Sequence, residues 1–81
     1  MHLEIISPEN ILYSGQAASL TLPGLLGSFM ILDHHAPIIS VLSQGKLTYN
    51  ANEQETEFAI SGGFVEMKNN VVSVCIESLT A

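Results

Sequence analysis

The chain has 81 residues, so we expect a single domain over residues 1–81 with one small hydrophobic core. Eight acidic residues against two basic ones give a formal net charge of −6, which disfavours binding to nucleic acid or to an anionic membrane and favours a protein partner. The single cysteine excludes an intrachain disulfide, and no apolar run approaches the roughly 20 residues needed for direct membrane insertion.

Glycines and prolines divide most of the chain into intervals of strand length, and apolar and polar residues alternate within them. Leu20 and Leu22, for example, alternate with Ser19 and Thr21. A period of two places one set of side chains on a buried face and the other on an outer face. Strands are therefore predicted, in chain order, at residues 3–7, 11–14, 17–22, 28–32, 38–42, 46–51, 56–61, 64–68 and 71–77. So many short strands are typical of an all-β sandwich or flattened barrel.

The segment from Pro23 to Gly27 places two glycines around Leu25 and Leu26. It lacks the lysine and the following helix of a phosphate-binding loop, so it predicts a tight turn with two leucines at its tip. Exposed leucines at a loop tip are unusual in a solitary protein. We expect these leucines either to fold back onto the core or to contact a partner.

Two of the predicted strands are apolar on both sides. All residues from Phe29 to Leu32 are apolar, and so are Ile38 and Ile39. A strand of an isolated sandwich needs only one apolar face. These strands either lie at a corner where both faces are covered internally, or they form an outer patch that docks on a partner.

Asp33, His34 and His35 are adjacent residues of metal-ligand type. Neighbours on an extended chain point in different directions and rarely bind one ion together, so we expect no metal site here. A turn is favoured instead, in which Asp33 accepts hydrogen bonds from the local backbone and Pro37 fixes the following chain. Cys75 lies within a predicted strand and no third group orients it for catalysis, so no catalytic residue is expected.

Residues 46–61 predict a hairpin whose turn lies in the polar stretch 50–53. The hairpin is acidic, which favours a solvated sheet edge that charge protects from aggregation. Its glutamates are Glu53, Glu55 and Glu57. The pair Gly62-Gly63 predicts a turn or bulge with positive φ before the next strand.

Several motifs together resemble one known family. In chain order they are Leu3-Glu4-Ile5-Ile6-Ser7-Pro8-Glu9, the run from Leu22 to Pro37, Ser61-Gly62-Gly63-Phe64-Val65-Glu66, and Asn70-Val71-Val72-Ser73-Val74. In this order and spacing they resemble, over nearly the whole chain, the N-terminal domain of the ε subunit of F-type ATP synthases. The resemblance implies a ten-stranded β-sandwich that performs no catalysis and needs no cofactor.

The resemblance also implies a mechanical role in the central stalk of the rotor. Members of that family clamp the γ subunit to the membrane-embedded c-ring, so that ion flow is coupled to ATP synthesis on other subunits. We therefore expect one copy per complex and a monomer when the chain is isolated. The implied location is peripheral, at the cytoplasmic face of a bacterial inner membrane, where the complex holds the chain.

Two sets of partner-binding residues follow from the resemblance, position by position. The set expected to face the c-ring is Leu25, Leu26, Ser28, Phe29 and Asp33. The set expected to pack on the γ subunit is His35, Ala36, Pro37, Ile38 and Ile39. We expect the Ile38 side chain to face the partner. Some members carry a glutamate where this chain has Ser28, which argues against a charge contact at that position.

Many members of the family continue into a C-terminal helical hairpin that inhibits ATP hydrolysis or binds ATP. This segment is absent from the sequence, so we expect neither property of this polypeptide. Two rival hypotheses remain. One is a free-standing β-sandwich that binds a peptide or small ligand, although the chain has no tryptophan to build an aromatic platform. The other is an enzyme built on the run Asp33-His34-His35 or on Cys75, which stoichiometric zinc or iron would support.

Overall fold

The computed structural model describes residues 1–80, which form nine strands and no helix. The strands are β1 (His2–Ile6), β2 (Ile11–Gln16), β3 (Ser19–Gly24), β4 (Gly27–Leu32), β5 (Ile38–Leu42), β6 (Gly45–Ala51), β7 (Gln54–Ile60), β8 (Gly63–Lys68) and β9 (Val71–Ile76). Each strand overlaps one of the nine predicted segments, so the all-β prediction is confirmed. Within the described residues no helix is long and apolar enough to cross a membrane.

The tenth strand that the family resemblance implied is reduced to a single bridge. Ile60 at the end of β7 pairs with Leu79, and the Thr80 amide donates to the Ala59 carbonyl oxygen at 2.8 Å. This segment, which comes after β9 in the chain, runs beside β7 over too few residues to form a strand. The described part of the chain therefore has nine strands, and the expected number of ten was wrong by this one short segment.

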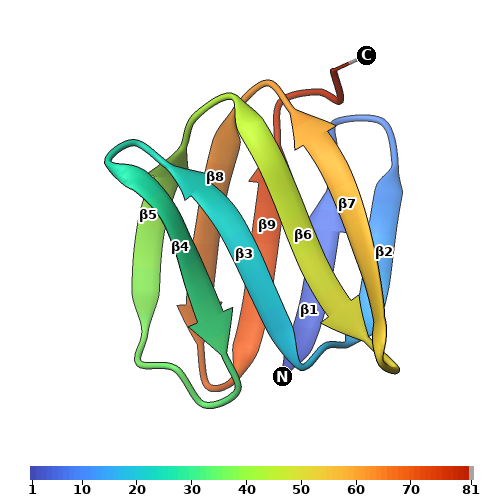
Figure 1. Ribbon diagram of the computed structural model, residues 1–81, viewed down its shortest axis with the longest axis vertical. Coiled ribbons are helices and arrows are strands. Elements are labelled where there is room, and N and C mark those ends of the chain that lie inside the picture. The colour runs from blue at the N-terminus through green and yellow to red at the C-terminus, as the bar shows by residue number, and fades with distance from the viewer. Residues whose placement is uncertain (81) are drawn as a thin grey trace.

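The strands form one sheet that curls over itself into two layers (Figure 1). The order is β2-β1-β9-β8-β5-β3-β6-β7. β5 and β6 pair with different ends of β3, and β4 pairs with the whole length of β3. β4, β3, β6 and β7 form the front layer in Figure 1, and β5, β8, β9, β1 and β2 form the back layer. The layers are joined where Gly24 of β3 pairs with Leu42 of β5. The result is the predicted sandwich, built from one continuous sheet.

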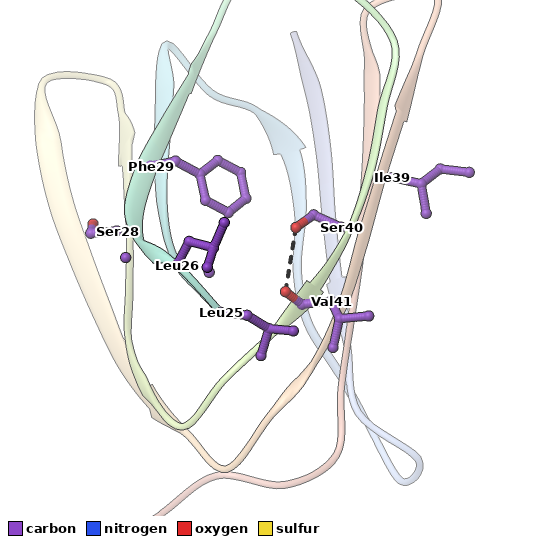
Figure 2. Close-up of a pocket in the computed structure, with 9 residues that line it drawn as sticks. Leu25, Leu26, Ser28, Phe29, Ile39, Ser40 and Val41 are labelled. Atoms are coloured by element: carbon purple, nitrogen blue, oxygen red, sulfur yellow. Dashed lines mark hydrogen bonds between the residues drawn. The ribbon is translucent and has the colours of Figure 1, made fainter.

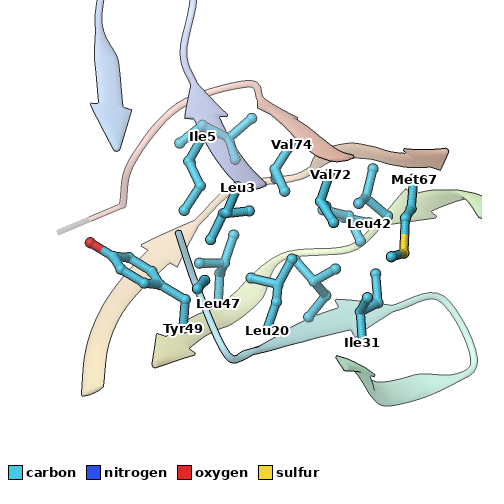
Figure 3. Packing of buried hydrophobic residues seen from close by; sticks show 14 of the residues in the cluster. Leu3, Ile5, Leu20, Ile31, Leu42, Leu47, Tyr49, Met67, Val72 and Val74 are labelled. Atoms are coloured by element: carbon cyan, nitrogen blue, oxygen red, sulfur yellow. The ribbon is translucent and has the colours of Figure 1, made fainter. Parts of the chain in front are cut away.

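The core lies between the two layers and follows the predicted alternation (Figure 3). Leu3 and Ile5 of the back layer face Leu20 and Leu47 of the front layer, and all four are fully buried. Burying one such side chain contributes about 1.5–3 kcal/mol. The core as a whole comprises Met1, Leu3, Ile5, Ala17, Leu20, Leu22, Ile31, Leu42, Leu47, Tyr49, Ile60, Val65, Met67, Val72, Val74 and Ile76. The outer faces of both layers are thus left free for other roles.

The predicted hairpin is confirmed as β6 and β7 joined by a two-residue turn. Asn52 and Glu53 have φ values of 54° and 63°, which is typical of the turns whose twist matches the strands. β7 is an edge of the sheet, and its glutamates are exposed. Gly62 and Gly63 have φ values of 158° and 153°, as the glycine pair predicted. The acidic strand therefore protects a free edge.

Candidate docking surface

The β3–β4 hairpin presents two leucines at its tip. Gly24 pairs with Gly27, which leaves Leu25 and Leu26 as a two-residue turn. Leu26 is fully exposed and Leu25 is 67% exposed. Gly27 has a φ of 129°, a conformation that favours glycine and lets the chain reverse here. The leucines therefore do not fold back onto the core, and of the two expected outcomes only contact with a partner stays open.

A hollow of about 560 Å³ lies between this hairpin and β5 (Figure 2). Leu26 and Phe29 lie on one side of it, and Ser40 and Val41 lie on the other. Its full lining is Gly24, Leu25, Leu26, Gly27, Ser28, Phe29, Ile39, Ser40 and Val41. The structure therefore brings four residues of the expected c-ring set together with Ile39 of the expected γ set.

The two isoleucines at the start of β5 point in opposite directions. Ile38 is half-buried and packs against the core, whereas Ile39 is 74% exposed. The alternation of the strand turns the Ile38 side chain toward the core but leaves it partly exposed, so its expected contact with a partner stays a prediction. Ile39 presents the outward face of β5 instead.

Strand register builds an apolar row across the whole outer face of the back layer. Val41 pairs with Phe64, Phe64 with Cys75, Cys75 with Ile6, and Ile6 with Ile11. Val41, Phe64 and Ile11 are 57%, 48% and 68% exposed. Neighbouring strands lie about 4.8 Å apart, so a row over five strands extends roughly 19 Å. The apolar row cannot be read from the sequence, since only the pairing of distant strands brings its residues together.

The neighbouring positions on the same face are mostly polar. Beside Ile39 the register places Glu66, then Ser73, then Glu4 and Ser14. Two carboxylates thus lie next to the apolar row on the same side. A partner that covers the apolar row therefore needs apolar groups flanked by basic or hydrogen-bonding ones.

The outer face of the front layer has a different chemistry. Thr21 of β3 pairs with Met30 of β4 on one side and with Thr48 of β6 on the other, and Thr48 pairs with Glu57. Met30 and Leu32 at the β4 edge are 54% and 53% exposed, whereas the positions on β3, β6 and β7 are polar. The exposed and half-buried apolar residues of the back layer thus run across all five of its strands, whereas on these rows of the front layer they are confined to the β4 edge.

The turn between β4 and β5 is held by contacts from distant parts of the chain. Asp33 Oδ1 accepts hydrogen bonds from the Met1 ammonium at 2.6 Å and from Asn70 Nδ2 at 2.9 Å. The hydrogen bond from the Met1 ammonium has the larger effect and that from Asn70 the smaller, and both lower the pKa of the Asp33 carboxyl. Asp33 therefore does not cap its own turn, and the predicted local backbone bonds were wrong.

The structure does not bring Asp33 together with the rest of its expected set. Asp33 follows one end of β4, whereas Leu26 precedes the other end (Figure 1). His35, Ala36 and Pro37 of the expected γ set lie in the same turn as Asp33 and are exposed. Asp33 thus belongs with the turn rather than with the hairpin tip.

The candidate chemical groups have ordinary structural surroundings. Within residues 1–80 no three metal-ligand side chains gather in one place. The Nδ1 atom of His35 lies 2.7 Å from the Ala36 carbonyl oxygen. Cys75 is half-buried, and its partners on the two adjacent strands are Phe64 and Ile6. His34 Nε2 lies 3.5 Å from Asp33 Oδ2, but both side chains are exposed, and within residues 1–80 no nucleophile is placed beside this pair.

The whole chain, residues 1–81, matches the model of the family described as ATP synthase, Delta/Epsilon chain, beta-sandwich domain. The chain belongs to this family. The ATP synthase epsilon chain of Leptospira borgpetersenii is 42% identical over 74 residues, which cover 91% of this chain and 58% of that relative. The family resemblance expected from the motifs is thereby confirmed, for a chain that spans less than two thirds of this relative.

Two solved assemblies contain a chain with the same fold. One is the mitochondrial ATP synthase of Euglena gracilis, OSCP/F1/c-ring, with a TM-score of 0.89 and 20% identity, covering 96% of this chain and 51% of that one. The other is the central stalk and c-ring of the mitochondrial ATP synthase of Tetrahymena thermophila, with a TM-score of 0.83 and 17% identity, covering 98% and 64%. At these identities the likeness establishes the β-sandwich fold.

Proposed function

We propose that this chain is the β-sandwich domain of a non-catalytic rotor subunit of an F-type ATP synthase, which links the γ subunit to the c-ring. The observation that carries the proposal is the exposed apolar surface formed by the apolar row, the hollow and the hairpin tip. Family membership and the stalk assemblies that contain the same fold support it. A rotor link of this kind needs two firm contact surfaces and no reacting groups.

We assign the two partners to two parts of this surface. The γ subunit covers the outer face of the back layer, from Ile39 across the apolar row, and contacts the turn His35–Pro37. The c-ring contacts the hairpin tip through Leu25 and Leu26, with Ser28 and Phe29 behind them. The hollow lies where the two areas meet, and Val41 belongs to both.

The sandwich suits torque transfer because its core holds both surfaces in fixed relation. β5 carries part of the γ-facing area and is held in the core by the nearly fully buried Leu42. β4 follows the hairpin tip and is held in the core by the fully buried Ile31. Packed interiors deform little under load. A force applied at the hairpin tip is therefore passed to the back layer without a conformational step.

Charge substitution on the docking face tests the γ assignment. Phe64→Asp should weaken binding to the purified γ subunit at least about tenfold, because an exposed aromatic anchor would be lost and a carboxylate buried. Thr21→Asp adds the same charge to a strand of the polar front layer and serves as the matched control. Calorimetric titration gives the affinities, and far-UV circular dichroism checks the fold. Equal affinities of the two variants would refute the assignment.

The setting in the cell is part of the same proposal. We infer one copy per complex, held peripherally at the cytoplasmic face of a bacterial inner membrane through its partners. Native membranes should release the chain together with γ and c subunits on mild detergent extraction, and the isolated chain should be monomeric by light scattering. Recovery of the chain free of both subunits would contradict this setting.

A second candidate function rests on the hollow. Its volume of about 560 Å³ lies within the range of small-ligand pockets, and its lining is largely apolar. A free-standing module for a peptide or small ligand would use this site. A ligand screen by thermal shift separates the hypotheses, because a tight ligand raises the melting temperature of the isolated chain. Binding to γ without any such ligand favours the rotor function.

A further inference from the structure

The α-amino group of Met1 is part of the structure rather than a loose end. Its ammonium donates to the Ala17 carbonyl oxygen at 3.2 Å and to Asp33 Oδ1 at 2.6 Å. The Met1 carbonyl oxygen accepts from the Ala17 amide at 2.9 Å, and the Met1 side chain is buried in the core. The buried Met1 side chain and the bonds to Ala17 thus fix the position of the amine, and Asp33 binds the amine at that position.

The other end of the contact is the β4–β5 turn. Asn70 of the β8–β9 turn donates its side-chain amide to Asp33 and accepts the His34 amide at 2.7 Å. The His35 amide donates to the Leu32 carbonyl oxygen at 3.1 Å. His34 has a φ of 62°, a conformation that residues with side chains adopt uncommonly and at a cost in free energy. The hydrogen bonds to Asp33 and His34 offset this cost.

We propose that, in a chain that begins at Met1, the free α-amino group is a positioning group for the β4–β5 turn, and that acylation of this amine releases the turn. Transfer of an acetyl group from an acyl thioester forms the N–C bond and breaks the C–S bond of the donor; of the three ammonium protons one leaves with the thiol and one goes to solvent, so the nitrogen becomes a neutral amide with a single N–H. The charged donor to Asp33 is then lost, and only one of the two acceptors of the amine can still be served. Asp33 then keeps the bond from Asn70 and at most an uncharged N–H in place of the ammonium, so the contact that holds the turn is weakened.

The consequence for docking rests on the proposed function. His35, Ala36 and Pro37 belong to this turn, so its release would loosen one part of the γ contact. The effect on the turn itself needs no partner and is measured on the isolated chain. Failure of the lock and failure of the γ assignment are therefore distinguishable.

Amide hydrogen exchange provides the test. Two forms of the full chain are compared, one with a free amino terminus and one N-acetylated at Met1. The amides of His34 and His35 should exchange about tenfold faster in the acetylated chain, while the amides of core strand β9 keep their protection. Rates for the two turn amides that agree within about twofold would overturn the proposal.

A second variant separates a specific lock from a general effect of acetylation. Asp33→Ala removes the acceptor, so it should speed exchange at His34 and His35 in the free-amine chain. In that background acetylation should add little, because both changes remove the same contact. Effects that add fully would overturn the proposal. If acetylation unfolds the chain, Asp33→Ala alone decides: faster exchange confined to the turn supports the lock, and unchanged exchange overturns it.

Discussion

Gly63 of β8 lies directly against the backbone of its partner strand. A Cβ atom on Gly63 would overlap the carbonyl oxygen of Cys75 and come within 2.9 Å of Ile76 Cα. The φ of 153° is also one that residues with side chains rarely adopt. The glycine therefore permits the close approach of β8 and β9, on which the register of the apolar row depends.

Gly63→Ala should destabilise the domain by about 2 kcal/mol or more, because it adds a backbone clash to an unfavourable dihedral angle. In a domain of this size such a change lowers the melting temperature by roughly 10 °C. Gly15→Ala is the control, since its Cβ would meet only the Tyr13 side chain, at 3.0 Å from the hydroxyl oxygen and 3.3 Å from Cζ, and no backbone atom. Thermal denaturation compares the two, and equal melting temperatures would contradict the close approach.

Substitution of one buried and one exposed isoleucine compares the contributions of the core and of the outer face to stability. Ile31→Ala should cost about 2–4 kcal/mol because the side chain is fully buried, whereas Ile39→Ala should change stability by less than about 0.5 kcal/mol. Urea unfolding followed by circular dichroism gives both values. A large loss for Ile39→Ala would show that this side chain belongs to the core and not to the docking face.

The hairpin tip offers a test of the c-ring contact. Leu26→Asp should reduce retention of the chain by isolated c-ring about tenfold, because a carboxylate would replace an apolar contact. The melting temperature should stay unchanged, since Leu26 is fully exposed. Asn52→Asp places the same charge in the two-residue turn of another hairpin and should leave retention unaltered. Equal retention of the two variants would argue against a c-ring contact at the tip.

The Asp33 contact predicts a pH dependence with a definite sign. The Met1 ammonium, with help from Asn70 and the nearby His34, lowers the pKa of the Asp33 carboxyl in the folded state. The stabilising contribution of Asp33 is therefore fully present above the ordinary value of about 3.9 and is lost as the pH falls through the lower folded-state value. Its size is modest because the side chain is half exposed.

Melting curves of the unaltered chain and Asp33→Asn, recorded from pH 7 down to the acid limit of folding, check this prediction. The unaltered chain should melt a few degrees higher at neutral pH, and the difference should shrink only in the acid range. A difference that disappeared near neutral pH instead would assign the effect to another group.

Much of the fold followed from local patterns in the sequence. The alternation at residues such as Leu20 and Leu22 predicts which side chains are buried, because a strand turns successive residues to opposite faces. Polar residues at 50–53 and the pair Gly62-Gly63 predict the turns, because few residues adopt positive φ. These features require no knowledge of which strand pairs with which, and the structure confirms them.

The sequence by itself determined the all-β class, the strand positions and the family. Tertiary structure alone decided how those strands combine into a surface. The apolar row needs β1 to pair with β9 in parallel, and Asp33 needs the ammonium of Met1, 32 residues away. Alternation shows that Ile38 and Ile39 point to opposite faces, but it does not show which of them points inward until one side chain of the strand has been placed. Long-range register supplies that reference, because a shift of one residue would turn every side chain of a strand to its other face.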